Sequence, residues 1–176
     1  LHFGAATASR MSALKSVGIM VLATATSVAE ALVLQDSGVD VLVMQSYGAG
    51  GHSGAFLGPP DLTTADRVGL QTLVEDPTAA VRLPAAAAGG LMTGRDVADV
   101  IGAGAAGAQL GTAFVACPES LASDRYRELL SSGVATRLTS NISGRPARAL
   151  VNDLLLWADD LAAVPPDYPL CDDAVK

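Results

Sequence analysis

Apolar runs separated by short segments rich in polar residues and glycine dominate the pattern of this 176-residue chain. "LKSVGIMVLATATS" from Leu14 and "LQDSGVDVLVMQSY" from Leu34 align at a spacing of 20 residues, and each holds the end of a helix, a glycine and an apolar run. Gly18 and Gly38 are predicted to end these helices, because glycine adopts the left-handed conformation without steric cost. A weaker third copy, "VIGAGAAGAQLGTAF", begins at Val100. The order helix, glycine, strand, loop, helix is typical of a parallel α/β sheet.

The same pattern predicts the individual elements. The predicted strands are Leu1–Gly4, Ile19–Thr24, Val39–Gln45, Leu83–Ala88 and Ala106–Gly111. The predicted helices are Ser9–Val17, Val28–Asp36, Thr64–Val81 with an interruption at Pro77, and Gly94–Ile101. Ser27 and Thr93 are predicted N-caps, and Glu30 follows Ser27 at the spacing of a capping box.

The pattern changes after the last of these strands. Helices without strands are predicted at Pro118–Ser131 and Ala147–Leu161, with a polar loop through Pro146 between them and an extended tail after them. We therefore expect two segments: βα units over residues 1–118, and a C-terminal helical segment with its tail over residues 119–176.

Two architectures accommodate five parallel strands. One is an open, doubly wound sheet, and the other is the C-terminal portion of a (β/α)8 barrel whose earlier strands precede Leu1. In such barrels a phosphate site is often formed by the loops after strands 7 and 8. Here the last two predicted strands are followed by Gly89-Gly90 and by Gly111-Thr112. This placement favours the barrel.

Composition and charge narrow the class of partner. Half of the residues are hydrophobic but only 4% are aromatic, so the core is predicted to consist mainly of Ala, Val and Leu. The net charge of −7 argues against binding to nucleic acid or to an anionic membrane surface, and favours a small molecule. The apolar stretch Val97–Cys117 contains Asp99, Gln109 and several glycines, so it is not expected to span a membrane. Two cysteines without metal-ligand spacing are typical of a reduced cytoplasmic protein, and we expect no metal site.

Two glycine-rich motifs invite a nucleotide-binding interpretation. "GAGAAG", Gly102 to Gly107, satisfies GxGxxG, but it closes a helix and precedes a strand, which is the reverse of the order that a dinucleotide site requires. Turn glycines are the favoured interpretation there. "AAAAGGLMTGRDV" from Ala85 has the required order, so the N–H groups of Gly89 and Gly90 could approach a phosphate. A tight βα turn is the alternative, but "AQLGTAF" repeats the arrangement with the hydroxyl of Thr112, and the pair favours one phosphate site.

His52, in "YGAGGHSGAF", follows the strand that ends at Gln45. One interpretation is a hydrogen-bonded or solvent-facing loop residue, and the other is a group that takes a proton from carbon, to which a neutral imidazole is suited. The surrounding glycines leave room for a flat molecule. Gln45 is either an ordinary amide at a strand end or a group that recognises a heterocycle with alternating C=O and N–H groups. His2 is expected to be structural or to line a substrate.

Four segments in order, "QSYGAGGHSGAFLG", "AAAAGGLMTGRDV", "GAQLGTAFVACPES" and "TSNISGRPARALVND", resemble the nitronate monooxygenase family, formerly called 2-nitropropane dioxygenases. The resemblance runs from Leu1 to near Lys176. It implies a flavin-binding (β/α)8 barrel, with about three N-terminal βα units and a short C-terminal remainder outside this sequence. It also implies noncovalently bound FMN and the oxidation of an alkyl nitronate, or a nitroalkane, with O₂ to a carbonyl compound and nitrite.

The resemblance assigns roles to residues by matching position. It implies that Gln45 and Gly50 contact the flavin, and that His52 is the base that acts on neutral nitroalkanes. The residues that it implies around the FMN phosphate are Gly89, Gly90, Gln109, Leu110, Gly111 and Thr112.

Two other functions are alternatives to nitronate oxidation. Flavin-dependent enoyl-(acyl carrier protein) reductases are similar in barrel, glycine loops and active-site histidine, but "AFLGPPDLTT" and "SGRPARALVND" favour the monooxygenases. A non-catalytic FMN-binding fragment is the second alternative, because an incomplete barrel exposes strand edges. The oligomeric state is left open, with a homodimer as one alternative.

Overall fold

A computed structural model describes residues 1–58, 70, 74–75 and 80–160. The chain forms two compact units: unit 1 comprises Leu1–Gly48 and Gly54–Leu110, and unit 2 comprises Ala49–Ser53 and Gly111–Lys176. The domain boundary expected between residues 118 and 119 stays a prediction.

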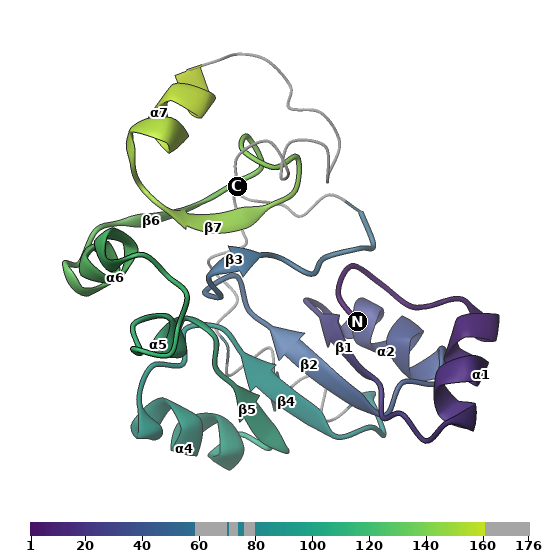
Figure 1. The fold of residues 1–176 in the computed structure, drawn as a ribbon. Coiled ribbons are helices and arrows are strands. Elements are labelled where there is room, and N and C mark those ends of the chain that lie inside the picture. The colour runs from purple at the N-terminus through teal and green to yellow at the C-terminus, as the bar shows by residue number, and fades with distance from the viewer. Residues whose placement is uncertain (59–69, 71–73, 76–79, 161–176) are drawn as a thin grey trace. The chain divides into compact units, whose positions relative to one another are not determined.

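Unit 1 is built on a four-stranded parallel sheet (Figure 1). Its strands, in spatial order, are β1 (Leu22–Ala25), β2 (Val41–Gln45), β4 (Ala85–Ala88) and β5 (Gly107–Gln109). The helices of this unit include α1 (Ala8–Ser16), α2 (Val28–Asp36) and α4 (Gly94–Gly102). Helix α2 packs against β1 and β2, and α4 packs against β5. The predicted parallel α/β architecture is therefore confirmed.

Local signals in the sequence explain where these helices begin and end. Ser27 caps α2 by accepting the N–H of Glu30, and Thr93 caps α4 by accepting the N–H of Asp96, as predicted. Gly18 and Gly38 follow the C-caps of α1 and α2 with φ of 74° and 86°, a conformation that favours glycine. The short helices consequently stop in time for the chain to enter the next strand.

The core of unit 1 consists of two buried apolar clusters. The first includes Leu34, Leu42 and Met44, all fully buried, and the second includes Val74 and Ala87. Strand β4 has the sequence Ala-Ala-Ala-Ala, and small side chains in a buried strand let neighbouring elements approach closely. This arrangement agrees with the aromatic-poor core expected from composition.

The first predicted strand, Leu1–Gly4, is wrong. The carbonyl of Leu1 accepts the N–H of Thr24 at 3.0 Å, and the N-terminal ammonium of Leu1 donates to the carbonyl of Leu22. Beyond that point Phe3 has φ of 66° and Gly4 has φ of 113°, so the backbone leaves the extended conformation. Pairing with β1 therefore stops before a strand can form.

Unit 2 contains an antiparallel sheet that the sequence pattern did not predict (Figure 1). Its spatial order is β3 (Gly51–His52), β7 (Ala147–Leu150) and β6 (Thr136–Thr139). The expectation of helices without strands in this region is therefore wrong. "ARAL" has good intrinsic helix propensity, but its backbone pairs with β6 on one side and β3 on the other, and this tertiary pairing overrides the propensity.

The described part of unit 2 contains the helices α5 (Thr112–Val115), α6 (Asp124–Ser131) and α7 (Asp153–Asp160). The helix predicted at Pro118–Ser131 begins only at Asp124, because Ser123 caps it by accepting the N–H of Tyr126 at 3.2 Å. The helix predicted at Ala147–Leu161 begins at Asp153, after β7. Most of the predicted helix Thr64–Val81 and the whole predicted tail lie outside the described residues. Among the residues that are described, no helix has both the length and the apolar character needed to cross a membrane.

Glu30 is a buried carboxylate that joins α2 to two other segments of unit 1. Its residue is 3% exposed. Its Oε2 accepts from the N–H and the hydroxyl of Thr26 at 2.7 and 2.8 Å. Its Oε1 accepts from the N–H groups of Phe56 and Leu57 at 2.6 and 3.0 Å. The carboxylate of Glu30 therefore accepts from these four donors, and the predicted capping box with Ser27 is not completed.

Replacing Glu30 with Gln is expected to destabilise the protein. The amide NH₂ faces N–H donors, so buried hydrogen bonds are lost at a cost on the order of 2–3 kcal/mol. Urea unfolding followed by circular dichroism measures the effect. The control is Glu128→Gln, which removes an exposed carboxylate 3.6 Å from Arg125 and is expected to change the free energy of unfolding by less than about 0.5 kcal/mol. Equal midpoints for the two variants would refute the anchoring role of Glu30.

Candidate functional site

The parallel register of unit 1 aligns two predicted site residues, Gln45 and Gln109, in one row. Gln45 of β2 pairs with Ala88 of β4, and Ala88 pairs with Gln109 of β5. The N–H of Ser46 then donates to the carbonyl of Ala88 at 2.9 Å, which continues the pairing one residue past the end of β2. Gln45, Gln109 and the residues that follow Ala88 therefore emerge at the same carboxyl edge of the sheet, where proteins with parallel sheets bind their ligands.

Gly89 and Gly90, which follow β4, both have left-handed backbones. Their φ angles are 108° and 73°, a region that strains residues with a Cβ. Gly90 is exposed, and no heavy atom lies within 4 Å of the position that its Cβ would occupy. A Cβ at Gly48 would lie 3.8 Å from the nitrogen of Gly90, so the segment after β2 lies close to this loop. Two consecutive glycines in this conformation can present backbone N–H groups to an anion.

The N-terminus of α4, just after these glycines, is occupied by its own carboxylate. Oδ2 of Asp96 accepts from the N–H of Met92 at 2.9 Å, and from the N–H and the hydroxyl of Thr93 at 2.7 and 2.9 Å. The hydrogen bond from Met92, followed by those from Thr93, lowers the pKa of Asp96. These donors therefore serve Asp96, whose carboxylate lies at the start of α4.

Gln45 has a structural hydrogen bond in addition to its predicted role. Its Oε1 accepts the N–H of Gly54 at 2.7 Å. A Cβ on Gly54 would lie only 2.7 Å from Cγ2 of Thr24 and 3.0 Å from Cε1 of His2, so glycine is needed for this close packing. The amide of Gln45 thus helps to hold the segment that follows the histidine loop.

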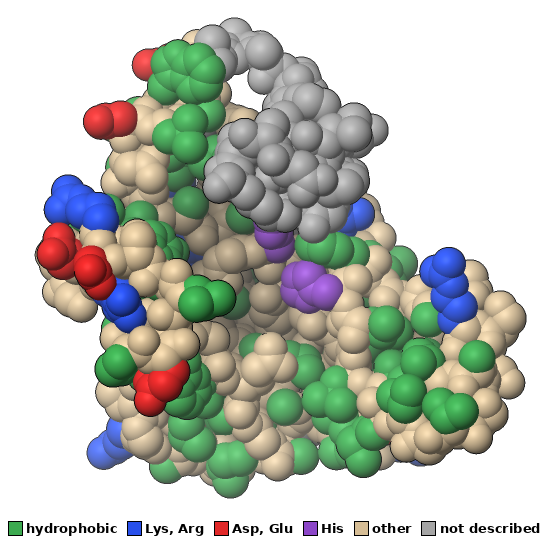
Figure 2. All heavy atoms as spheres, viewed as in Figure 1, with side chains coloured by type: hydrophobic (Ala, Val, Ile, Leu, Met, Phe, Trp, Pro, Cys, Tyr) green, Lys and Arg blue, Asp and Glu red, His purple; other side chains and the backbone are tan. Residues whose placement is uncertain are grey.

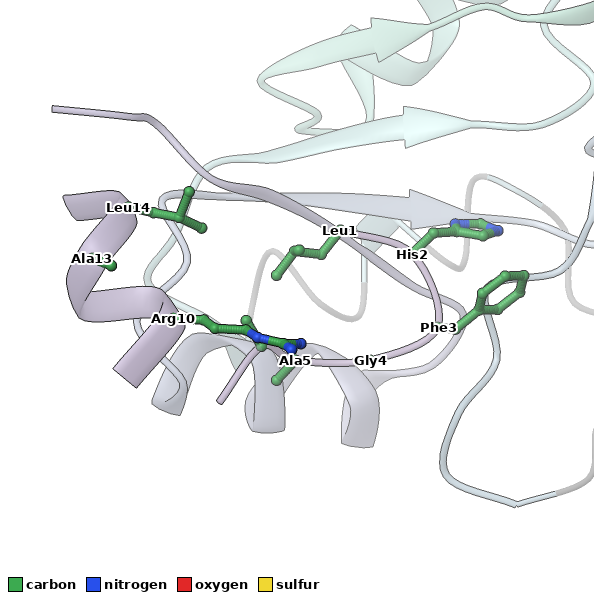
Figure 3. Close-up of a pocket in the computed structure, with 9 residues that line it drawn as sticks. Leu1, His2, Phe3, Gly4, Ala5, Arg10, Ala13 and Leu14 are labelled. Atoms are coloured by element: carbon green, nitrogen blue, oxygen red, sulfur yellow. The ribbon is translucent and has the colours of Figure 1, made fainter. Parts of the chain in front are cut away.

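His2 also lines a cavity of about 520 Å³ at the start of the chain (Figure 3). The other lining residues include Phe3, Arg10 and Leu14, and the ring centroids of His2 and Phe3 are 4.4 Å apart. None of the predicted flavin contacts lines this cavity. It contributes nothing to the candidate site.

In unit 2, His52 lies on a short strand rather than in a turn. It pairs with Ala147 of β7, and the N–H of the next residue, Ser53, donates to the carbonyl of Pro146 at 2.8 Å. The Nε2 atom of His52 is 2.8 Å from Oγ of Ser143. The imidazole is only partly buried, and both histidines (purple) reach the surface in Figure 2.

Ser143 contacts His52, and the sequence did not identify it as part of the candidate site. It is 4% exposed, and it belongs to the segment "TSNISGRPARALVND" that carried part of the family resemblance without any assigned role. Ser143 and His52 are 91 residues apart in the sequence. Only the pairing of β3 with β7 brings the two segments together, and no local sequence pattern predicts that pairing.

Gly50 and Thr112, two further predicted flavin contacts, are neighbours in unit 2. A Cβ on Gly50 would lie 2.6 Å from Oγ1 of Thr112, so only glycine permits this approach. Thr112 is the first residue of α5, and Gly111 is its N-cap.

The predicted site residues are divided between the two units. Those in unit 1 are Gln45, Gly89, Gly90, Gln109 and Leu110, and those in unit 2 are Gly50, His52, Gly111 and Thr112. Within the described part of the chain, no cluster of three or more His, Cys, Asp or Glu side chains could hold a metal ion.

Comparison with known proteins gives consistent results. The family model described as nitronate monooxygenase matches residues 1–173. Nitronate monooxygenases of Pseudomonas aeruginosa and Paraburkholderia phytofirmans are each 43% identical over 99% of this chain, which covers 50% and 48% of those proteins. The chain therefore spans about half the length of these relatives.

Solved structures support the predicted fold. A nitroalkane oxidase from Streptomyces ansochromogenes is 37% identical with a TM-score of 0.86, over 96% of this chain and 48% of that one. FabK from Thermotoga maritima is 26% identical with a TM-score of 0.72, over 89% of this chain and 51% of that one. The parallel α/β sheet of unit 1 is accordingly part of a (β/α)8 barrel, as predicted, with four strands described here rather than five.

Gly50→Ala is expected to destabilise the protein by about 1–3 kcal/mol, because the new methyl group overlaps Oγ1 of Thr112 and forces the two segments apart. Gly111→Ala is the control: nothing lies within 4 Å of its Cβ position, and its φ of −116° suits any residue. Thermal and urea unfolding of the two variants measure the difference. If both variants unfold like the wild type, Gly50 and Thr112 do not approach as closely as described.

Proposed function

Because the chain belongs to the nitronate monooxygenase family, we propose that the protein oxidises alkyl nitronates, or nitroalkanes, with O₂ to carbonyl compounds and nitrite. The observation that carries this proposal is the family match along nearly the whole chain. The aligned row at the carboxyl edge of β2, β4 and β5 gives it physical support. The alternative enoyl reductase activity has no observation in its favour, since the two relatives described above are both named nitronate monooxygenases.

The proposed cofactor is FMN, within a family that is flavin-dependent in general. When bound, the flavin would accept electrons from the substrate and pass them to O₂. The proposal assigns the FMN phosphate to the N–H groups of Gly89 and Gly90, with Gln109, Leu110, Gly111 and Thr112 contributing further contacts. The left-handed backbone at both glycines and the open space beside Gly90, which a Cβ would fill, fit such a role.

Three of this chain's residues are proposed to act nearer to the reaction. Gln45 and Gly50 contact the flavin ring, and His52 removes the α-proton from a neutral nitroalkane. A preformed nitronate has already lost that proton, so it does not need a base. The partners are thus the nitronate or nitroalkane and O₂, and we further propose a cytoplasmic protein that assembles as a homodimer.

The flavin assignment predicts a yellow protein with the absorption of oxidised FMN. Gly90→Ala is expected to raise the Kd for FMN on the order of 10-fold, because a Cβ strains the left-handed backbone by about 1–2 kcal/mol and displaces the N–H groups. Gly94→Ala, the first residue of α4, has open space around its Cβ position and is expected to bind FMN like the wild type. Quenching of FMN fluorescence measures both affinities.

Colourless protein that does not take up added FMN would overturn the proposed function. Protein that binds FMN but oxidises neither substrate would instead support the alternative of a non-catalytic flavin-binding fragment.

His52→Asn is expected to lower kcat/KM for neutral nitroalkanes by about 10²- to 10⁴-fold, the usual contribution of a general base. Turnover of preformed nitronates is the internal control and is expected to change little. Oxygen consumption and nitrite release measure both rates. An equal loss on the two substrates would mean that the imidazole positions substrate or flavin rather than removing a proton.

A further inference from the structure

The hydroxyl of Ser143 has two polar neighbours, and they constrain where its hydrogen lies. Oγ of Ser143 is 3.1 Å from the carbonyl oxygen of Arg145 and 2.8 Å from Nε2 of His52. A carbonyl oxygen can only accept a hydrogen bond, so the two contacts are both hydrogen bonds only when the hydroxyl hydrogen of Ser143 points to Arg145. The oxygen of Ser143 must then accept from His52, and the hydrogen of that bond is carried by Nε2.

This arrangement determines the tautomer of the neutral imidazole. A neutral histidine ring carries one N–H hydrogen, and the other nitrogen is the basic atom. With the hydrogen on Nε2, the basic atom of His52 is Nδ1. Ser143 is buried, at 4% exposure, so competition from water for its hydroxyl is limited.

The fold holds both residues in this geometry. His52 pairs with Ala147, the first residue of β7, and the N–H of Ser53 donates to the carbonyl of Pro146. Gly144 has φ of 83°, and its N–H donates to the carbonyl of Ser140 at 2.9 Å, which makes a tight turn just before β7. The backbone of Ser143 is therefore set by the turn on one side and by the strand pairing on the other.

We propose that Ser143 is a positioning residue that keeps Nε2 of His52 protonated and so makes Nδ1 the atom that receives the substrate proton. This inference rests on the proposed role of His52 as the base. In the step concerned, the C–H bond at the α-carbon of the nitroalkane breaks and an N–H bond forms at Nδ1. The electron pair stays on the substrate as the nitronate. The bond from Nε2–H to Ser143 persists and strengthens as the ring becomes cationic, because hydrogen bonds to charged groups are the stronger ones.

The test is the tautomer itself, which is measured without substrate. Nitrogen-15 NMR of protein labelled at histidine distinguishes N–H from unprotonated ring nitrogens, and the chain has only two histidines to assign. In the wild-type protein at a pH where the ring is neutral, His52 is expected to show hydrogen on Nε2, with slow exchange of that hydrogen with solvent. Ser143→Ala is expected to give a mixture of tautomers and fast exchange. Ser143→Thr, which keeps the hydroxyl, is expected to restore the wild-type spectrum.

Ser132→Ala is the matched control. Like Ser143, Ser132 donates its hydroxyl to a backbone carbonyl, that of Leu129, at 2.9 Å. Unlike Ser143, it is exposed, at the C-cap of α6. It is expected to leave the His52 signals unchanged. In kinetics, Ser143→Ala is expected to lower kcat/KM for neutral nitroalkanes on the order of 10-fold, the worth of one hydrogen bond to a charged group, and to leave nitronate turnover unchanged.

Hydrogen on Nδ1 in the wild type, or an unchanged tautomer in Ser143→Ala, would overturn the inference. A tautomer change without any loss on nitroalkanes would equally refute the positioning role. The failure of the proposed function is a separate result: the wild-type protein would then take up no FMN and oxidise neither substrate, whatever the NMR spectra show. Full nitroalkane activity in His52→Asn would instead refute the base role on which this inference rests.

Discussion

The register between β2 and β4 is the constraint on which the rest of unit 1 depends. Because Gln45 pairs with Ala88, and Ala88 pairs with Gln109, three strands end at one level. A shift of one residue would turn Leu42 and Met44, which are fully buried in the first core cluster, to the opposite face and would bring Val43 into their place. Burial of these apolar side chains therefore specifies the register. The register in turn determines which backbone groups reach the edge where a ligand of a parallel sheet binds.

Side chains that look available for a ligand serve the backbone in this structure. The carboxylate of Glu30 accepts from four donors, and the amide oxygen of Gln45 accepts from Gly54. The bonds from Gly54, Phe56 and Leu57 hold the segment of residues 54–57, directly after the strand that carries His52. A polar side chain near the candidate site can therefore hold the backbone as well as bind a ligand. Leaving a buried N–H donor unpaired costs free energy, so the fold requires these hydrogen bonds.

The sequence predicted the parts of the fold whose causes are local. Helix α2 has the predicted bounds, and α1 and α4 agree within one residue at each end, because N-cap hydroxyls and left-handed glycines act on their immediate neighbours. The carboxyl-edge row was also predictable, since parallel strands all end on the same side. The antiparallel sheet was not, because β3, β6 and β7 depend on pairing between distant segments, and "ARAL" has no strand pattern of its own. Ser143 was missed for the same reason: its contact with His52 exists only after β3 pairs with β7.

The capping box of α4 changes the physical account of anion binding at this edge. A helix N-terminus attracts phosphate because its first N–H groups lack partners and carry the positive end of the helix dipole. Asp96 already accepts from Met92 and Thr93, so part of that attraction is satisfied internally and a negative charge sits beside it. Attraction by the helix alone is therefore an insufficient explanation for a phosphate here. The phosphate site proposed above therefore relies on the N–H groups of Gly89 and Gly90, whose left-handed backbones suit contacts with an anion.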